Sequence, residues 1–380
     1  MFDLKLAVRS NILALKPYRC ARDDYSCGVL LDANENAYGS AALNSGVKGL
    51  ERYPDPRQND IKQLICNYRK TSTPENLFLG VGSDECIDLA IRVFCKPGVD
   101  RILITPPTYG IYSVSAQVND VSLVKIPLLV GNSNFQLDVP GIISAIKADP
   151  TIKIVFLCSP GNPTGTLLKH GDIKEILECS LYKGVVFVDE AYIDFIESES
   201  ISAWASSQYP NLIVSQTLSK AFGLAGARLG YTISSREIAQ IFNNTKAPYN
   251  ISSPSSKIAK DALSPLGISQ MRENVCKLLS QRTRLLVEFK KIVFLGSPLG
   301  LNDANFILIP VVHLGLPSNK LAHDIYFALA ETCGVVVRFR GMEYGCEGTL
   351  RITVGTEEDN TFLLEQLKSR VINDLVTLMT

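Results

Sequence analysis

A lysine stands where few lysines are needed for structure alone, in the stretch "QTLSKAFGLAGARLG". Ser219 and Lys220 follow the apolar run "NLIVS" and precede a segment spaced by glycines. Glycines let another group approach the backbone closely, and lysine is a poor turn former. Most lysines at strand ends are merely solvated, however. The meaning of Lys220 therefore depends on whether other segments end in matching chemistry.

Three predicted strands end in polar side chains that suit one task. "IVFLCSPGNPTG" supplies Asn162, "VVFVDEAY" supplies Asp189 and Tyr192, and "LIVSQTLSK" supplies Lys220. Ligands of open α/β sheets gather beyond the carboxyl ends of the strands. A lysine that forms a Schiff base must be neutral part of the time, and a buried aspartate needs a cationic partner. A protonated pyridine nitrogen is such a partner, while the amide and the phenol can hydrogen-bond a ring oxygen.

A phosphate anchor is predicted one strand earlier, in "LGVGSDECIDLA". Ser83 and Asp84 open an amphipathic helix there, and backbone N–H groups at a helix start hold anions. Thr217 and Ser219 offer hydroxyls, and Arg228 offers a guanidinium fork.

Stacking on the ring is predicted for Tyr109 in "PPTYGIY". Simpler explanations exist for single residues: Asp84 as a helix cap, Asn162 as a loop-ordering amide, Tyr192 as a core aromatic. Five segments that meet one cofactor's needs in order favour the site.

These residues need a scaffold, and the pattern between residues 77 and 240 predicts an α/β one. Short β-branched runs such as "LFLGV", "RILIT", "IKIVFLC" and "VVFVDE" alternate with amphipathic stretches. After residue 300 come "NFILIP", a helix near 318–333, "VVVRF", "LRITV" and a final helix from about 356, which predict a smaller α+β domain. We expect an arm over 1–50 that belongs with the small domain and a dimer contact, a large domain over 51–260 and a small domain over 261–380.

The bulk composition excludes several classes of protein. Lysine plus arginine and aspartate plus glutamate both number 38 among 380 residues, so no net charge favours nucleic acid or an anionic membrane. The ten cysteines form no C-x-x-C pair, and the three histidines lack a metal-ligand spacing, so no metal site is expected. Neither a signal peptide nor a membrane-length apolar window is found, which predicts a cytoplasmic enzyme.

The motifs together resemble one family of proteins over about residues 16 to 356. "LDANENAYG", "RYPDP", "GVGSDE", "SPGNPTG", "VDEAYIDF", "TLSKAFGLAGARLG", "KAPYNIS" and "LRITVGT" occur in the order found in fold-type I pyridoxal-phosphate enzymes, and within them the histidinol-phosphate aminotransferases. The resemblance implies an aspartate-aminotransferase-like fold and pyridoxal 5'-phosphate as cofactor. It also implies amino-group exchange between L-histidinol phosphate and 2-oxoglutarate in histidine biosynthesis. Ala37 stands where the family has the proline of "NENP".

The same resemblance assigns roles to residues. Lys220 would bind the cofactor covalently and carry the proton, Asp189 would pair with the pyridinium, and Tyr192 and Asn162 would hold the ring oxygen. Ser83, Asp84, Thr217, Ser219 and Arg228 would surround the cofactor phosphate, with Tyr109 on the ring. Substrate binding falls to Arg351, Arg338, Tyr18 and Asn162. Tyr53 would reach the cofactor phosphate of a neighbouring subunit, which implies a homodimer with shared active sites.

Alternatives stay open at this point. An aromatic-amino-acid transaminase and a threonine-phosphate decarboxylase use the same scaffold, and a non-catalytic cofactor-binding protein would keep the phosphate site but lose Lys220 or Asp189. Arg338 could instead form a surface salt bridge, with Arg340 so near, and Tyr53 could simply pack on the arm.

Overall fold

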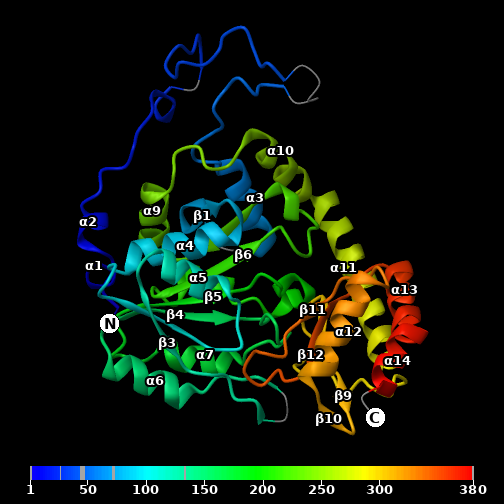
Figure 1. Ribbon diagram of the computed structural model, residues 1–380. Coiled ribbons are helices and arrows are strands. Elements are labelled where there is room, and N and C mark those ends of the chain that lie inside the picture. The colour runs from blue at the N-terminus through cyan, green and yellow to red at the C-terminus, as the bar shows by residue number, and fades with distance from the viewer. Residues whose placement is uncertain (1, 26, 43–47, 71–72, 132–133, 379–380) are drawn as a thin grey trace.

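The computed structural model describes residues 2–25, 27–42, 48–70, 73–131 and 134–378 (Figure 1). Its centre is a seven-stranded sheet in the order β1-β7-β6-β5-β4-β2-β3, and only β7 runs antiparallel to its neighbours. This is the mostly parallel α/β sheet that the sequence predicts. The strands are β1 (Leu77–Gly80), β2 (Arg101–Ile104), β3 (Ser122–Lys125), β4 (Ile152–Cys158), β5 (Val185–Asp189), β6 (Leu212–Thr217) and β7 (Gly230–Ile233).

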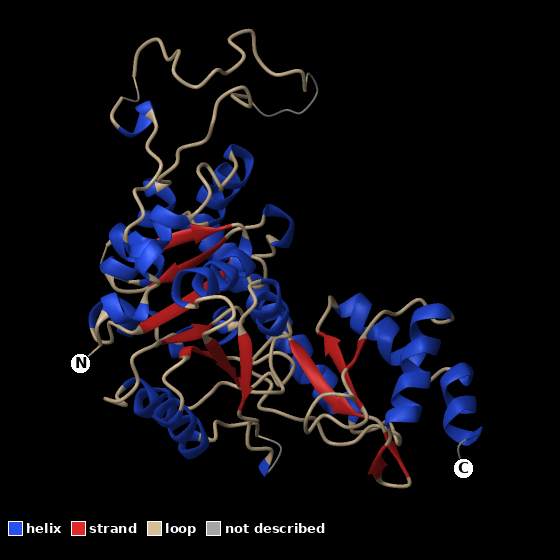
Figure 2. Cartoon of the chain, turned by 60° about the vertical axis from the view of Figure 1, so that its left-hand side comes forward, coloured by secondary structure: helices blue, strands red, loops and turns tan. Residues whose placement is uncertain are grey.

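Helices cover both faces of this sheet, because strands such as β4 and β5 are apolar on both sides and bury every or nearly every residue (Figure 2). One face packs a core with α3, α6, α7 and α8, and the other packs a core with α4, α5 and α9. The bounds are α3 (Asn59–Arg69), α4 (Gly82–Phe94), α5 (Ile111–Val118), α6 (Val139–Ala148), α7 (His170–Leu177), α8 (Ser202–Ser207), α9 (Arg236–Thr245) and α10 (Ser253–Ala262). Short 3-10 turns are η1 (Ala21–Asp23), η2 (Pro74–Asn76), η4 (Ile193–Glu199) and η5 (Ala225–Ala227).

A second, antiparallel sheet in the order β11-β12-β8 lies beside the large one. The long helix α11 packs into both cores: Met271 and Val275 lie in the large core, and Leu285 and Phe289 in the small one. The expected division at residues 260 and 261, just before α11, stays a prediction. The elements are α11 (Pro265–Phe289), β8 (Phe306–Pro310), β9 (Val312–His313), β10 (Leu316–Pro317), α12 (Asn319–Glu331), β11 (Arg338–Phe339), β12 (Thr349–Thr353), α13 (Glu357–Leu367) and α14 (Arg370–Leu378).

Two predicted elements differ in extent. The strand expected over "VVVRF" pairs with β12 only through Arg338 and Phe339, because Val336 is 80% exposed and lies beyond the sheet. The final helix is interrupted between α13 and α14, where Lys368 and Ser369 leave the helical path.

The chain begins against the large sheet, whereas the sequence analysis grouped residues 1–50 with the small domain. Two single-turn helices, α1 (Leu4–Ala7) and α2 (Ser10–Leu13), precede the arm. Ala7 and Val8 are buried in the core that α4 closes, and Arg9 Nη1 donates to the Arg92 carbonyl at 2.8 Å. The described residues of the arm that follow α2, 14–25, 27–42 and 48–58, extend away from the body of the molecule (Figure 1).

Candidate active site

The site forms where neighbouring parallel strands end at one edge of the large sheet. Cys158 of β4 lies opposite Asp189 of β5, and Asp189 lies opposite Ser215 of β6. Asp189 is the last residue of its strand, and the predicted Asn162 and Lys220 follow the ends of β4 and β6 by four and three residues. Adjacent parallel strands therefore gather the three side chains, as the sequence analysis expected.

Asp189 is buried, with 2% of its surface exposed. Its carboxylate accepts hydrogen bonds from the Tyr112 hydroxyl at 2.8 Å and from the Ala191 N–H at 3.1 Å. Burial raises the pKa of Asp189 to about 6, while Tyr112 and Ala191 act in the opposite direction by stabilising the anion. A carboxylate held this way at neutral pH suits a cation placed against it.

Tyr112 was missed by the sequence reasoning, which chose Tyr109 from the same "PPTYGIY". Tyr112 is fully buried and stacks on Phe156 with ring centroids 4.8 Å apart. Tyr109 precedes α5 and its N-cap Gly110, whereas Tyr112 lies inside the helix, so only the packing of the helix on the sheet reveals the role of Tyr112.

Lys220 lies at the mouth of the site, with its Nζ 5.4 Å from the centre of the Tyr192 ring. Its side chain is partly open to solvent, yet enough protein surrounds the amine to lower the pKa of Lys220. Partial burial is the main cause, and repulsion from Arg351 adds to it, while Asp189 opposes it. A lysine that loses its proton more readily is better able to act as a nucleophile and a base.

Tyr192 and Asn162 line the same site and are both almost buried. The Tyr192 ring meets Phe306 of β8 edge-on at 5.2 Å, and burial raises the pKa of its hydroxyl. Asn162 Oδ1 accepts from Arg351 Nη1 at 2.5 Å. Because Arg351 belongs to β12, this hydrogen bond connects the two sheets across the site.

Arg351 faces a second arginine across the small sheet. Arg338 is its direct partner in the register of β11 and β12, so both side chains leave the same face. Burial, then repulsion from Arg340 and Arg338, lowers the pKa of Arg351. Among the described residues, buried Arg351 Nε has no hydrogen-bond partner. Two guanidinium groups with an unused buried donor are chemically suited to bind an anion.

At the start of α4, backbone atoms crowd Gly230, and the guanidinium of Arg228 lies against Gly82. A Cβ on Gly82, whose φ is +72°, would come within 2.3 Å of Arg228 Nη2. A Cβ on Gly230 would come within 2.3 Å of the Ser83 nitrogen. Glycine at both positions therefore brings the Arg228 guanidinium and the first N–H groups of α4 to one place, a concave donor set of the kind that holds phosphate.

Side chains complete this phosphate cradle. Arg228 Nη2 donates to Asp84 Oδ2 at 3.2 Å, and Nη1 donates to the Ser219 hydroxyl at 3.4 Å. The Thr217 hydroxyl donates to Ser219 Oγ at 2.9 Å, and the Tyr109 hydroxyl donates to Asp84 Oδ1 at 3.2 Å. Burial, with the negative charge of Asp84, raises the pKa of Tyr109 to about 12. The expected phosphate ligands thus lie together.

A buried polar network behind the site was also missed. Arg69 Nη2 donates to Asp194 Oδ1 at 2.5 Å, and its Nε donates to Gln216 Oε1 at 2.7 Å. Gln216 Nε2 in turn donates to Glu190 Oε2 at 2.6 Å. Glu190 follows Asp189 and Gln216 precedes Thr217, so the network holds the ends of β5 and β6. Only the tertiary fold brings Arg69 to it.

Two predicted residues of the arm lie elsewhere. Tyr53 stacks on Tyr249 with centroids 4.6 Å apart, and Tyr18 is 68% exposed beside a groove that Tyr249 also lines. Glu35 orders this part of the arm by accepting from the Tyr53 N–H at 2.7 Å and from Arg52 Nη1 at 2.6 Å. Within the described residues, no contact joins either tyrosine to Lys220.

The sheet order and the converging lysine, aspartate and phosphate cradle define a pyridoxal-phosphate type of aminotransferase site. The family model "Aminotransferase class I and II" matches residues 28–367. The histidinol-phosphate aminotransferase of Schizosaccharomyces pombe is 52% identical over 97% of this chain and 97% of its own length. The chain therefore belongs to the class I and II aminotransferases and, within them, to the histidinol-phosphate aminotransferase family.

Solved structures agree with this assignment. The histidinol-phosphate aminotransferase of Clostridium acetobutylicum superposes with a TM-score of 0.74 at 27% identity, covering 88% of this chain and 94% of that one. The enzyme of Sinorhizobium meliloti, in complex with pyridoxal-5'-phosphate, has the same fold, with a TM-score of 0.75 at 23% identity and 90% coverage of each chain.

No helix among the described residues has the length and hydropathy to cross a membrane. No group of three or more histidine, cysteine or acidic side chains in the described part could hold a metal ion.

Proposed function

We propose that this chain is the transaminase that exchanges an amino group between L-histidinol phosphate and 2-oxoglutarate, giving imidazole acetol phosphate and L-glutamate in histidine biosynthesis. The observation that carries the proposal is the position of the Lys220 amine, between the buried Asp189 on the large sheet and the Asn162–Arg351 pair that reaches from the small sheet. Relatives with that name cover nearly the full length of the chain.

The residues present fit pyridoxal 5'-phosphate. The backbone N–H groups of Ser83 and Asp84, with Thr217, Ser219 and Arg228, would hold its phosphate, next to Gly82. Asp189 would face its ring nitrogen, and Asn162 and Tyr192 its ring oxygen, with Tyr109 along the ring. The cofactor supplies an electron sink for the bond to the substrate's α-carbon.

The protein's own part is to bind, orient and move a proton. Lys220, with its lowered pKa, is free of its proton in a larger fraction of molecules and can accept one from the substrate's α-carbon. Asp189 would keep a negative charge against the ring nitrogen, since its Tyr112 and Ala191 hydrogen bonds favour the anion. Tyr192 and Phe306 exclude water from one side of the amine.

Two different amino donors must use one site. Glutamate presents an α-carboxylate and histidinol phosphate a phosphate, and the planar fork of Arg351 matches either anion. Arg338, beside it on the same face of the small sheet, would add a second cation for the phosphate. We assign Tyr18 to the same phosphate.

We further propose that the working molecule is a homodimer, in which Tyr53 completes the partner's cofactor site. Support comes from the arm, where large apolar side chains lie in solvent: Val29 is 88% exposed, Leu31 82% and Tyr38 102%. Exposed apolar surface of this size favours a protein contact. The cytoplasmic location stays a prediction.

The test is an assay of the purified protein with L-histidinol phosphate and 2-oxoglutarate, following glutamate formation. Turnover is expected with histidinol phosphate and not with threonine phosphate, whose decarboxylation would release carbon dioxide instead. A faster reaction with phenylalanine than with histidinol phosphate would overturn the proposal in favour of an aromatic transaminase. The molecular mass of the purified protein in solution, measured at several protein concentrations, tests whether it is a homodimer.

A further inference from the structure

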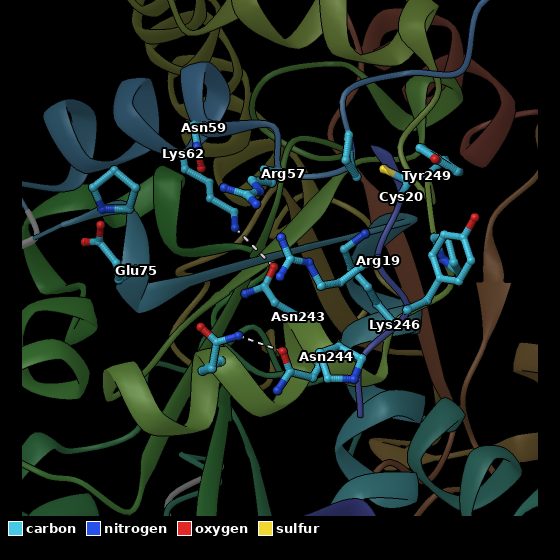
Figure 3. A pocket seen from close by; sticks show the side chains of 16 residues that line it. Arg19, Cys20, Arg57, Asn59, Lys62, Glu75, Asn243, Asn244, Lys246 and Tyr249 are labelled. Atoms are coloured by element: carbon cyan, nitrogen blue, oxygen red, sulfur yellow. Dashed lines mark hydrogen bonds between the residues drawn. The ribbon is translucent and has the colours of Figure 1, made fainter. Parts of the chain in front are cut away.

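Besides the cofactor cradle, cations gather beside the arm and on the small sheet. The first group, which includes Arg57 and Lys62, lines the groove between the arm, α3 and α9 (Figure 3). Tyr18 lines this groove too, so it belongs with the substrate and dimer assignments already made for the arm. The second group lies beside Arg351 and contains an arginine to which no role has been assigned, Arg340.

Arg340 lies on the face of the small sheet that carries Arg338 and Arg351. Its N–H donates to the Thr349 carbonyl at 2.9 Å, so the pairing with β12 continues one residue past the end of β11. Side chains alternate along a strand, so Arg340, two residues after Arg338, leaves the same face. The opposite face carries Leu350, which packs in the small core. One face of the small sheet therefore carries three guanidinium groups.

A tight turn after β11 positions the side chain of Arg340. The Glu343 N–H donates to the Arg340 carbonyl at 3.0 Å, and Arg340 Nη1 donates to Glu343 Oε1 at 2.7 Å. The two side chains are only 23% and 27% exposed, so solvent screens this ion pair less than a fully exposed one. Inside the turn, Gly341 packs against the side chain of Asn319, whose Oδ1 also accepts from the Gly348 N–H at 2.7 Å. The turn is thus anchored to the start of α12.

The charge of Arg340 acts on Arg351. Burial is the main cause that lowers the pKa of Arg351, and repulsion from Arg340 comes next and exceeds the repulsion from Arg338, while Glu343 opposes it. Among the described residues, the buried Nε of Arg340 and that of Arg351 both lack a hydrogen-bond partner. Two neighbouring cations that each keep a buried donor unused are stabilised when an anion binds between them.

The charges on this face match those of a phosphate monoester. Arg338, Arg340 and Arg351 carry three positive charges and Glu343 carries one negative charge, which leaves a net charge of +2. A phosphate monoester carries nearly two negative charges at pH 7 and above, because its second pKa is about 6, whereas a carboxylate carries one. The face therefore suits the phosphate of one amino donor better than the carboxylate of the other.

We propose that Arg340 is a specificity-determining residue of the substrate site, which favours the phosphorylated amino donor, and that Glu343 sets how strongly it does so. This inference rests on the proposed function. Arg340 supplies the third positive charge and its Nε donor to the substrate phosphate beside Arg351. Glu343 orients the Arg340 guanidinium and partly neutralises it when glutamate occupies the site. Without Arg340 the face keeps Glu343 and a net charge of +1, which matches a carboxylate.

Single-turnover kinetics of the holoenzyme with three amino donors test this role: L-histidinol phosphate, L-histidinol, which lacks the phosphate, and L-glutamate. In Arg340→Gln, kcat/KM for histidinol phosphate is expected to fall about ten- to a hundredfold, with a much smaller loss for the other two donors. Glu343→Gln is expected to act in the opposite direction and to lower the Kd for histidinol phosphate about three- to tenfold, because it removes a negative charge beside the phosphate.

The matched control is Lys291→Gln. Lys291 pairs with Glu288 at 2.5 Å and at the same three-residue spacing as Arg340 and Glu343, but it follows α11 and does not belong to the small sheet. This control loses one positive charge and one ion pair, and it is expected to react with all three donors as the wild type does. The visible absorption of the bound cofactor shows whether each variant is folded, and Glu343→Gln tests the proposal even if Arg340→Gln does not fold.

The signs of the two changes separate an electrostatic role from a structural one. If the Arg340–Glu343 pair only holds the turn, both variants lose activity together and by the same factor for all three donors, which would overturn the proposal. Equal losses for histidinol phosphate and histidinol in Arg340→Gln would overturn it as well. Either result, with a wild type that prefers histidinol phosphate, leaves the proposed function intact. A wild type that does not react with histidinol phosphate overturns the proposed function and this inference with it.

Discussion

The two anion sites proposed around Lys220, one for the cofactor phosphate and one for the substrate, are built in different ways. The cradle for the cofactor phosphate uses the start of α4, two small hydroxyl residues and Arg228, and its shape depends on glycine at two positions. The substrate site uses the side chains of Arg338 and Arg351 on the short strands β11 and β12 of the small sheet. One site is shaped by backbone and the other by long side chains.

This difference matches what each site must do. A resident cofactor needs one fixed geometry, which backbone N–H groups provide without losing side-chain entropy. Two alternating substrates need a site that accepts either a carboxylate or a phosphate, and arginine forks accept both. The hydrogen bond from Arg351 to Asn162 joins the small-sheet side of the site to the large-sheet side.

Both half-reactions are expected to use Lys220, so its loss should have the largest effect. Lys220→Ala removes the amine that both half-reactions require, so turnover falls about 10⁴-fold or more. The side chain is partly exposed, so the thermal stability of the variant should stay close to that of the wild type. Steady-state rates and the visible absorption of the bound cofactor measure these effects. Transamination at a near-wild-type rate would contradict the role of Lys220.

Asp189 is expected to matter for cofactor binding nearly as much. Leaving a buried charge unpaired costs about 3–5 kcal/mol, so Asp189→Asn should weaken cofactor affinity at least a hundredfold. Tyr112→Phe, which removes one hydrogen bond to the carboxylate, should have a smaller effect in the same direction. A cofactor titration followed by absorbance measures the affinity of each variant. Unchanged affinity would show that the carboxylate serves the fold alone.

In the cofactor-free protein, the same substitution is expected to stabilise the fold, although it weakens cofactor binding. The pKa of Asp189 is raised to about 6, above its value in the unfolded chain, so its contribution to stability is present at low pH and is lost as the pH rises through 6. Without cofactor, Asp189→Asn is therefore expected to be more stable than the wild type by about 1–3 kcal/mol at pH 8 and by little at pH 4. Denaturant unfolding at both pH values provides the check. A variant that is less stable at pH 8 would contradict it.

One methyl group added at Gly82 is expected to disrupt the proposed cofactor-phosphate cradle. Gly82→Ala places a Cβ against Arg228 and strains a φ of +72°, so cofactor affinity should fall about tenfold or more. Gly98→Ala is the matched control, because Gly98 has a φ of +68° but lies far along the chain from the cradle. Both variants should lose about 1–2 kcal/mol of stability, and only Gly82→Ala should lose cofactor. Equal affinities would mean that the cradle is not shaped by Gly82.

The sequence predicted the large-sheet half of the site better than the other half. Asp189 ends a strand, and Asn162 and Lys220 follow strands within four residues, so strand pattern and parallel topology were enough to bring them together. Arg69 and Tyr112 were missed because their roles depend on packing between distant segments, which no local pattern records. "VVVRF" has the composition of a strand throughout, but the sheet ends at Arg338, and local propensity carries no information about that edge.

The arm shows the same limit more strongly. "RYPDP" and "LDANENAYG" contain few apolar residues that could reveal a packing face, so their turn formers predict only an exposed segment. Glu35 nevertheless holds Arg22, Arg52 and the Tyr53 backbone together. Because these partners lie 13 to 18 residues away, the three-residue and four-residue spacings of helices could not have indicated them.

The most direct test of the account concerns Arg338. Single-turnover kinetics of each half-reaction, with glutamate and with histidinol phosphate, should be measured for the wild type, Arg351→Ala, Arg338→Ala and Tyr18→Phe. Arg351→Ala should damage both half-reactions, whereas Arg338→Ala and Tyr18→Phe should lower kcat/KM about ten- to a hundredfold for histidinol phosphate and little for glutamate. Equal losses for the two donors in Arg338→Ala would contradict the division of the substrate site that the structure supports.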